Sequence, residues 1–160
     1  MSDLQIGDLA PDFQMSTDSD GTVKLSDLKG QNVILYFYPK DDTPGCTKEA
    51  CAFQENLPHF KTNEAVIIGV SKDTTAKHDK FKAKYNLDFT LASDEDGAVC
   101  EAYGTWVEKS MYGKKYMGIE RSTFLIGQDG KILQMWRKVK VPGHVDAVLV
   151  ALQDTQKAAA

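Results

Sequence analysis

The chain has 160 residues, 42% hydrophobic and 26% charged, the balance of an ordinary globular protein. Its net charge of −4 and pI of about 5.3 argue against nucleic acid or an anionic membrane surface as a partner, because both normally require a basic face. Three cysteines are too few for a disulfide scaffold at this length, so any disulfide is expected to be catalytic.

The sequence contains no pattern of a membrane span or a targeting signal. No apolar stretch is long enough to cross a bilayer, and the start Met1-Ser2-Asp3-Leu4 lacks the basic and apolar regions of a signal peptide. There is also no internal repeat and no linker-like stretch. We therefore expect a cytoplasmic protein in which residues 1–160 form a single domain.

The chain begins with the pattern of a β-hairpin followed by a buried strand. Residues 18–21, Asp-Ser-Asp-Gly, predict a tight turn between strands at Phe13–Ser16 and Thr22–Leu25. The continuous apolar run Val33–Tyr38 is typical of a strand that is buried on both faces.

The next elements alternate between helix and strand. A helix is expected from about Cys46 to Lys61, with a break near Pro58. Ala65–Ser71 predicts a second buried strand. Thr75 is the expected cap of a helix that runs through Tyr85.

The rest of the chain predicts a short strand, a short helix, a loop, two strands around a tight turn and a closing amphipathic helix. These elements are expected at Phe89–Ala92, Asp96–Tyr103, Gly104–Glu120, Ser122–Ile126, Lys131–Arg137 and Gly143–Gln156. The two strands around the turn must be antiparallel, whereas strands joined by helices favour parallel pairing. The predicted fold is α/β and thioredoxin-like, with a mixed central sheet flanked by helices and an N-terminal β-hairpin extension.

Cys46 and Cys51 lie on different sides of the first predicted helix. Its apolar face is formed, at about 100° per residue, by Cys46, Ala50, Phe53, Leu57 and Phe60. Cys51 lies about 140° from Cys46, in the polar sector, so it has no role in the core. Cys46 therefore begins the buried face at the helix N-terminus.

A cysteine at this position is suited to act as a nucleophile. Unpaired N–H groups and the helix dipole favour an anion there. A free thiol with a pKa near ~8.5 is only about 3% thiolate at neutral pH, and the dipole contributes about 1 kcal/mol. Making the thiolate dominant takes roughly 3.4 kcal/mol, which is more than the dipole supplies. Another donor or a cation must therefore help: Thr43 could supply a hydroxyl, and a cation from elsewhere in the chain is also required.

The spacing of the two cysteines has a conformational consequence. Residues i and i+5 of an intact helix have Cα atoms roughly 8.6 Å apart. A disulfide requires less than about 7 Å. A bond between Cys46 and Cys51 therefore requires the first turns of the helix to unwind, which the neighbouring Pro44-Gly45 would ease.

At these residues the chain resembles the peroxiredoxins. Pro39-x-x-x-Thr43-x-x-Cys46 matches the active-site motif of that family, and the string from Tyr38 to Cys51 closely resembles the bacterioferritin comigratory protein, or peroxiredoxin Q, subfamily. Gly7-Asp8-x-Ala10-Pro11-Asp12-Phe13 resembles the usual start. Glu120–Ile126 resembles the strand that carries the active-site arginine, which Arg121 matches. The resemblance covers nearly the whole chain.

The resemblance implies a thiol peroxidase that reduces hydrogen peroxide and organic hydroperoxides. Cys46 would be oxidised to a sulfenic acid, and Cys51 would resolve it as an intramolecular disulfide. Thr43 would hydrogen-bond thiolate and peroxide, Arg121 would be the required cation, and Pro39 would shield the site from water. Thioredoxin or a similar dithiol would reduce the disulfide. A monomer is expected, with no metal, haem or flavin.

Three other functions compete with this one. A thioredoxin-like disulfide reductase normally has Cys-x-x-Cys, and the wider spacing here disfavours it. A redox sensor or holdase would use the same cysteines with slow turnover. A zinc module would use Cys46, Cys51, His59 and Cys100, whose spacings match no familiar ligand pattern.

The remaining candidate residues have simpler readings. Cys100 is expected to be a packed thiol, although some relatives carry a resolving cysteine on another helix. His59 and His78 are expected on helix surfaces. A pocket for the alkyl group of an organic hydroperoxide is a further hypothesis for the predicted loop Gly104–Glu120. It would be lined by the apolar residues Trp106, Met111 and Tyr112.

Overall fold

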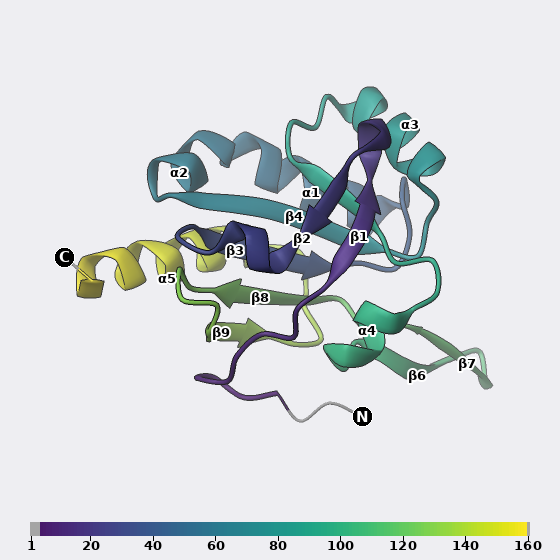
Figure 1. Cartoon of the computed structure of the whole chain (residues 1–160). Coiled ribbons are helices and arrows are strands. Elements are labelled where there is room, and N and C mark those ends of the chain that lie inside the picture. The colour runs from purple at the N-terminus through teal and green to yellow at the C-terminus, as the bar shows by residue number, and fades with distance from the viewer. Residues whose placement is uncertain (1–3, 160) are drawn as a thin grey trace.

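A seven-stranded mixed sheet forms the centre of the structure, a computed structural model that describes residues 4–159. Its strands are β1 (Gln14–Thr17), β2 (Thr22–Lys24), β3 (Asn32–Phe37), β4 (Ala65–Ser71), β5 (Thr90–Ser93), β8 (Ser122–Ile126) and β9 (Ile132–Trp136). They lie in the order β2-β1-β5-β4-β3-β8-β9 (Figure 1). The pairs β3–β4 and β4–β5 are parallel and the others antiparallel, which confirms the predicted mixed sheet.

Helices cover both faces of this sheet. They are α1 (Pro44–Glu55), α2 (Leu57–Thr62), α3 (Thr75–Tyr85), α4 (Ala98–Ala102) and α5 (His144–Ala159), with short 3-10 turns at Asp18–Asp20 and Leu25–Leu28. Residues of α1, α2, α3 and α5 share one hydrophobic cluster, and residues of α4 belong to a second one. Among the described residues, no helix is long and apolar enough to cross a membrane.

The alternation of side chains along β3 separates the two clusters. Ile34 and Tyr36 face α1 and α5, whereas Leu35 and Phe37 face α4 and the N-terminal segment. All six residues of β3 are buried, as the continuous apolar run predicted. Cys46 belongs to the first cluster and Cys100 to the second, so the sheet separates the two thiols.

The first long helix breaks two residues before Pro58. The predicted break near Pro58 is confirmed, because α1 ends at Glu55 and Asn56 leaves the helical conformation with φ −98° and ψ 4°. The Asn56 side chain donates to the carbonyl of Ala52 at 2.9 Å and thereby competes with the helix backbone. Pro58 then lies in the first turn of α2, where the missing N–H costs nothing.

The cap of α3 is shifted by one residue from the predicted position. Thr74, not Thr75, is the cap, and its hydroxyl accepts from the Lys77 N–H at 3.2 Å.

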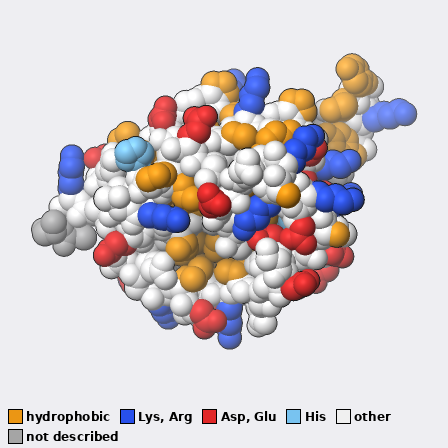
Figure 2. All heavy atoms as spheres, turned by 90° about the horizontal axis from the view of Figure 1, so that it is seen from above, with side chains coloured by type: hydrophobic (Ala, Val, Ile, Leu, Met, Phe, Trp, Pro, Cys, Tyr) orange, Lys and Arg blue, Asp and Glu red, His pale blue; other side chains and the backbone are white. Residues whose placement is uncertain are grey.

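The predicted loop Gly104–Glu120 is in fact largely a β-hairpin. Strands β6 (Trp106–Met111) and β7 (Lys114–Ile119) pair antiparallel across Tyr112-Gly113. Both turn residues have positive φ, 53° and 78°, which is the requirement of a type I′ turn. The hairpin projects beyond the main sheet near α4 (Figure 1) and exposes hydrophobic and basic side chains on its projecting end (Figure 2).

Candidate active site

Cys46 lies in the first turn of α1, just beyond the end of β3. Thr43 caps α1 in an extended conformation and Pro44 occupies its first position, where a fixed φ suits a helix start. Cys46 is only 2% exposed and begins the buried stripe that Ala50 and Phe53 continue, as the sequence predicted. Its sulfur therefore lies among helix N–H groups and away from bulk water, which favours an anion if a cation is close.

Arg121 provides that cation. It immediately precedes β8, and the pairing of Phe37 with Ser122 brings it beside the end of β3. Its Nη2 donates to the Cys46 sulfur at 3.3 Å, and its Nη1 donates to Glu49 Oε1 at 2.6 Å. Burial opposes the charge of Arg121, but Glu49 and Cys46 outweigh it and raise its pKa. The sequence and the resemblance thus placed Cys46 and Arg121 in one site, and the structure brings them into contact.

Glu49 is a site residue that the sequence reasoning missed. It is completely buried, and its Oε2 has no hydrogen-bond partner among the described residues. Burial raises the pKa of Glu49 to about 7, against the opposing effect of Arg121. The sequence feature that could have identified Glu49 is its spacing of three residues from Cys46, which places a carboxylate at the edge of the apolar stripe. Glu49 fixes one arm of the Arg121 guanidinium, so that the other arm is directed at the sulfur.

His144 and Thr123 lie on the far side of Glu49. The Nε2 of His144 is 2.8 Å from the Thr123 hydroxyl and 4.0 Å from Glu49 Oε2. The sequence predicted only that the closing helix starts here, and the structure shows the ring to be buried and packed edge-on against Trp136. Burial, and then the charge of Arg121, lower the pKa of His144 to about 4. His144 is therefore neutral at pH 7 and forms no ion pair with Glu49.

The neutral state of His144 predicts an acid-sensitive contribution to stability. The pKa of His144 is about 4 in the folded state and 6.5 in the unfolded state, so the unfolded chain takes up a proton first as pH falls. The contribution of His144 to the free energy of unfolding is therefore complete above about pH 6.5 and lost as pH falls toward 4. Replacing His144 with glutamine, whose amide can still form a hydrogen bond with Thr123, removes this dependence. Relative to the variant, the natural chain should lose about 2 kcal/mol of unfolding free energy between pH 7 and pH 5. Urea denaturation at both pH values measures the difference, and a constant difference would contradict the assignment.

Thr43 and Pro39 flank the site but do not contact the sulfur by hydrogen bonds. The Thr43 hydroxyl donates to the carbonyl of Lys40 at 2.9 Å, so its oxygen keeps only acceptor capacity. Pro39 is exposed and directly follows the buried Tyr38, the first residue after β3. A donor bond from Thr43 to the thiolate, as the resemblance implied, would require the hydroxyl to leave the Lys40 carbonyl.

The other two cysteines differ in environment. Cys51 is half-buried on α1, and burial, with a smaller effect of Glu55, raises its pKa. Cys100 is completely buried, and burial together with Asp94 raises its pKa strongly. All three thiols are free. Because Cys46 and Cys100 face opposite sides of the sheet, the four candidate zinc ligands do not converge.

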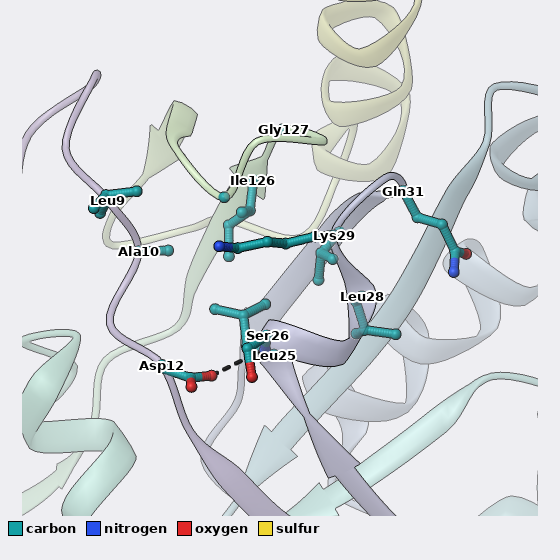
Figure 3. Close-up of a pocket in the computed structure, with 12 residues that line it drawn as sticks. Leu9, Ala10, Asp12, Leu25, Ser26, Leu28, Lys29, Gln31, Ile126 and Gly127 are labelled. Carbon is teal, nitrogen blue, oxygen red and sulfur yellow. Dashed lines mark hydrogen bonds between the residues drawn. The ribbon is translucent and has the colours of Figure 1, made fainter.

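Two hollows lie away from Cys46. One, of about 200 Å³, is on the opposite face of the sheet between Leu25, Leu28 and Ile126, with the Lys29 side chain among them (Figure 3). The other, of about 730 Å³, is lined by Trp106 and neighbouring residues of β6 and β7. Of the three apolar candidates, Trp106 lines this hollow, whereas Met111 and Tyr112 do not.

Comparison with known proteins identifies relatives over nearly the whole chain. The sequence model of the AhpC/TSA family matches residues 6–135. The chain is 54% identical to the putative peroxiredoxin bcp of Coxiella burnetii over 146 residues, covering 91% of this chain and 97% of that protein. It is 52% identical to peroxiredoxin Bcp of Bacillus subtilis over 151 residues, covering 94% and 96%.

Solved structures agree with these sequence matches. A structure of the Xanthomonas campestris bacterioferritin comigratory protein, studied for its alkyl peroxide reduction activity, superposes with a TM-score of 0.87 at 46% identity, covering 90% of this chain and 92% of that one. A mutant of Xylella fastidiosa PrxQ superposes with a TM-score of 0.91 at 42% identity, covering 97% and 99%.

Proposed function

The chain belongs to the AhpC/TSA family and is a peroxiredoxin, a thiol peroxidase, and from that premise we propose that Cys46 is its peroxidatic cysteine and Cys51 its resolving cysteine. One observation supports the first assignment most directly. The Cys46 sulfur, in the first turn of α1, accepts a hydrogen bond from Arg121 Nη2 at 3.3 Å. A thiolate is the nucleophile in such reactions, and a guanidinium at this distance favours it over the thiol.

In the first step the Cys46 thiolate attacks one peroxide oxygen. The sulfur–oxygen bond forms as the oxygen–oxygen bond breaks, giving a sulfenic acid and an alkoxide or hydroxide that takes a proton from solvent. Arg121 donates toward the negative charge that moves from sulfur to the leaving oxygen. Thr43 would orient the peroxide and Pro39 would limit the access of water. We extend the substrates to organic hydroperoxides, because the Xanthomonas relative was studied for alkyl peroxide reduction.

In the second step Cys51 gives up its proton and its thiolate attacks the sulfenic sulfur, whose hydroxyl group leaves and takes up a proton to form water. Both cysteines lie in the intact helix α1, where residues i and i+5 are roughly 8.6 Å apart between Cα atoms, so α1 must unwind for the disulfide to form. The break at Asn56 separates α1 from α2, so that Leu57 and Phe60 can keep their places in the core. Unwinding is then confined to a helix of 12 residues.

Recycling requires a dithiol reductant, for which we propose thioredoxin or a similar protein. Its thiolate would attack the disulfide and leave a mixed disulfide that its second thiol resolves. We propose a monomer, because both cysteines lie on one helix and no second chain is needed for the disulfide. We also propose a cytoplasmic location, because the cycle depends on a reducing compartment. A single domain over residues 1–160 completes the proposal, because one sheet carries both hydrophobic clusters.

The disulfide can be tested directly by peptide mapping. Lys48 lies between the two cysteines, so trypsin separates residues 41–48 from residues 49–61. After one equivalent of peroxide, a non-reduced digest should contain these two peptides joined by a disulfide, with the Cys100 thiol still free. Insulin reduction without peroxide consumption, or a disulfide that includes Cys100, would contradict the proposal.

Replacing Cys51 with serine should separate oxidation from turnover. The first oxidation of Cys46 should stay within a factor of about 3, because Cys51 does not contact the reacting sulfur. Steady-state NADPH oxidation with thioredoxin and its reductase should nearly vanish, because no disulfide forms. The same change at Cys100 is the matched control and should leave turnover near normal. Loss of turnover at Cys100 with Cys51 dispensable would move resolution to α4.

A further inference from the structure

His78 is a buried histidine whose two ring nitrogens both face acceptors. The sequence predicted a surface residue, which is wrong, because His78 is completely buried. Its Nδ1 is 2.6 Å from Asp41 Oδ2, and its Nε2 is 2.9 Å from the carbonyl of Ala92. A carbonyl only accepts, so Nε2 carries a proton, and the Asp41 carboxylate accepts from Nδ1 and from the Tyr38 hydroxyl. His78 is therefore an imidazolium paired with Asp41.

Burial alone would lower the pKa of His78, but the hydrogen bond and charge of Asp41 outweigh it and raise the pKa. Ala92 contributes its carbonyl from β5, and Asp73, in the turn between β4 and α3, is the further charged group near the ring. Both acidic side chains favour the charged ring, which accounts for a buried charged histidine.

This ion pair holds the loop that leads to Cys46. We define the active-site loop as residues 38–43, between β3 and α1. The Asp41 N–H donates to Asp73 Oδ2 at 2.7 Å, which fixes the backbone at the same residue. Asp42, with a positive φ of 59°, is held by Lys84 at 2.8 Å and by Tyr85 at 2.7 Å. The active-site loop is thus tied to α3 at two successive residues.

We propose that His78 is a positioning residue for the reaction at Cys46, whose pairing with Asp41 keeps the active-site loop anchored to α3 and β5 while α1 unwinds and re-forms. This inference rests on the proposed roles of Cys46 and Cys51. Each cycle must return the Cys46 sulfur to Arg121, so α1 must re-form from the same starting point, and the first turn of a helix is the costly step in its formation. Thr43, two residues after Asp41, is the N-cap of α1 and marks that starting point.

Two substitutions at His78 separate its two contacts. An asparagine amide nitrogen lies close to the position of Nδ1 and can still donate to Asp41, whereas a glutamine amide nitrogen lies close to Nε2 and reaches Ala92 instead. Stopped-flow fluorescence resolves the peroxide-dependent oxidation from the peroxide-independent resolution. His78→Gln should slow oxidation at least about tenfold and His78→Asn by less than about threefold, because misplacement of the sulfur acts on the bimolecular step. Neither variant should slow resolution.

Two further variants complete the test, one at the partner of His78 and one as a control for stability. Asp41→Asn should slow oxidation by the same factor as His78→Gln does. The double variant Asp41→Asn, His78→Gln should oxidise no more slowly than either single variant. Ile132→Val, in the other hydrophobic cluster, lowers stability without touching the active-site loop and should leave oxidation unchanged. Equal oxidation rates for His78→Gln and His78→Asn, or normal oxidation in His78→Gln, would overturn the inference. A natural chain whose Cys46 is not oxidised by peroxide would instead overturn the proposed function.

Discussion

Replacing Cys46 with serine is expected to abolish peroxide reduction. A serine hydroxyl is not ionised at neutral pH beside Arg121 and has no sulfenic acid state, so kcat/KM for hydrogen peroxide should fall by at least ~10⁴-fold. Cys51 cannot substitute for it, because its half-buried thiol has a raised pKa. The measurement is NADPH oxidation through thioredoxin reductase and thioredoxin with peroxide as the final acceptor.

The fold of this variant should be intact, which makes the result interpretable. Cys46 contributes a small side chain to the core, and a serine oxygen can accept the same hydrogen bond from Arg121. Circular dichroism and thermal unfolding should therefore change little. Cys100→Ser removes a thiol of the same size from the other face of the sheet and serves as the control. Substantial turnover in Cys46→Ser would refute the mechanism.

The position of Cys46, the proposed nucleophile, could be predicted from local sequence because it depends on local rules. A buried strand, a following Pro-Gly pair and an apolar stripe at helical spacing place Cys46 at a helix N-terminus, and the structure confirms the stripe through Ala50 and Phe53. The need for a distant cation followed from the small size of the helix dipole. Only the family resemblance identified Arg121, 75 residues away, because contacts across a sheet leave no local pattern.

The buried polar partners could not be predicted in this way. Glu49, His78 and His144 lie on helices beside exposed lysines or acids, and a helical pattern cannot distinguish a buried ion pair from a solvated face. Their burial depends on partners supplied by other segments, namely Arg121, Asp41 and Thr123. The β6–β7 hairpin was missed for a different reason. Its turn has tyrosine where asparagine or aspartate is usual, and its strands are largely exposed.

Replacing Arg121 with leucine is expected to affect both catalysis and stability. Loss of the donor at the sulfur should slow oxidation of Cys46 by about 10²–10³-fold, the usual effect of removing one charge-stabilising donor. Loss of the partner of Glu49 should lower the unfolding free energy by about 3–5 kcal/mol at pH 8, because a carboxylate is left buried and unpaired. At pH 5 this loss should be smaller, because Glu49, with its raised pKa, is then protonated.

The double variant Arg121→Leu, Glu49→Leu separates the two effects. Removing both charges leaves no unpaired ion in the core, so much of the stability should return, while the slow oxidation should remain. Arg121→Lys is the matched control, because one ammonium keeps the charge but cannot donate to Glu49 and Cys46 with the geometry of the guanidinium fork. Urea denaturation and stopped-flow oxidation measure the two quantities. A normal oxidation rate in the double variant would mean that Arg121 serves only to keep Glu49 in the core, and that the thiolate of Cys46 depends on the helix N-terminus alone.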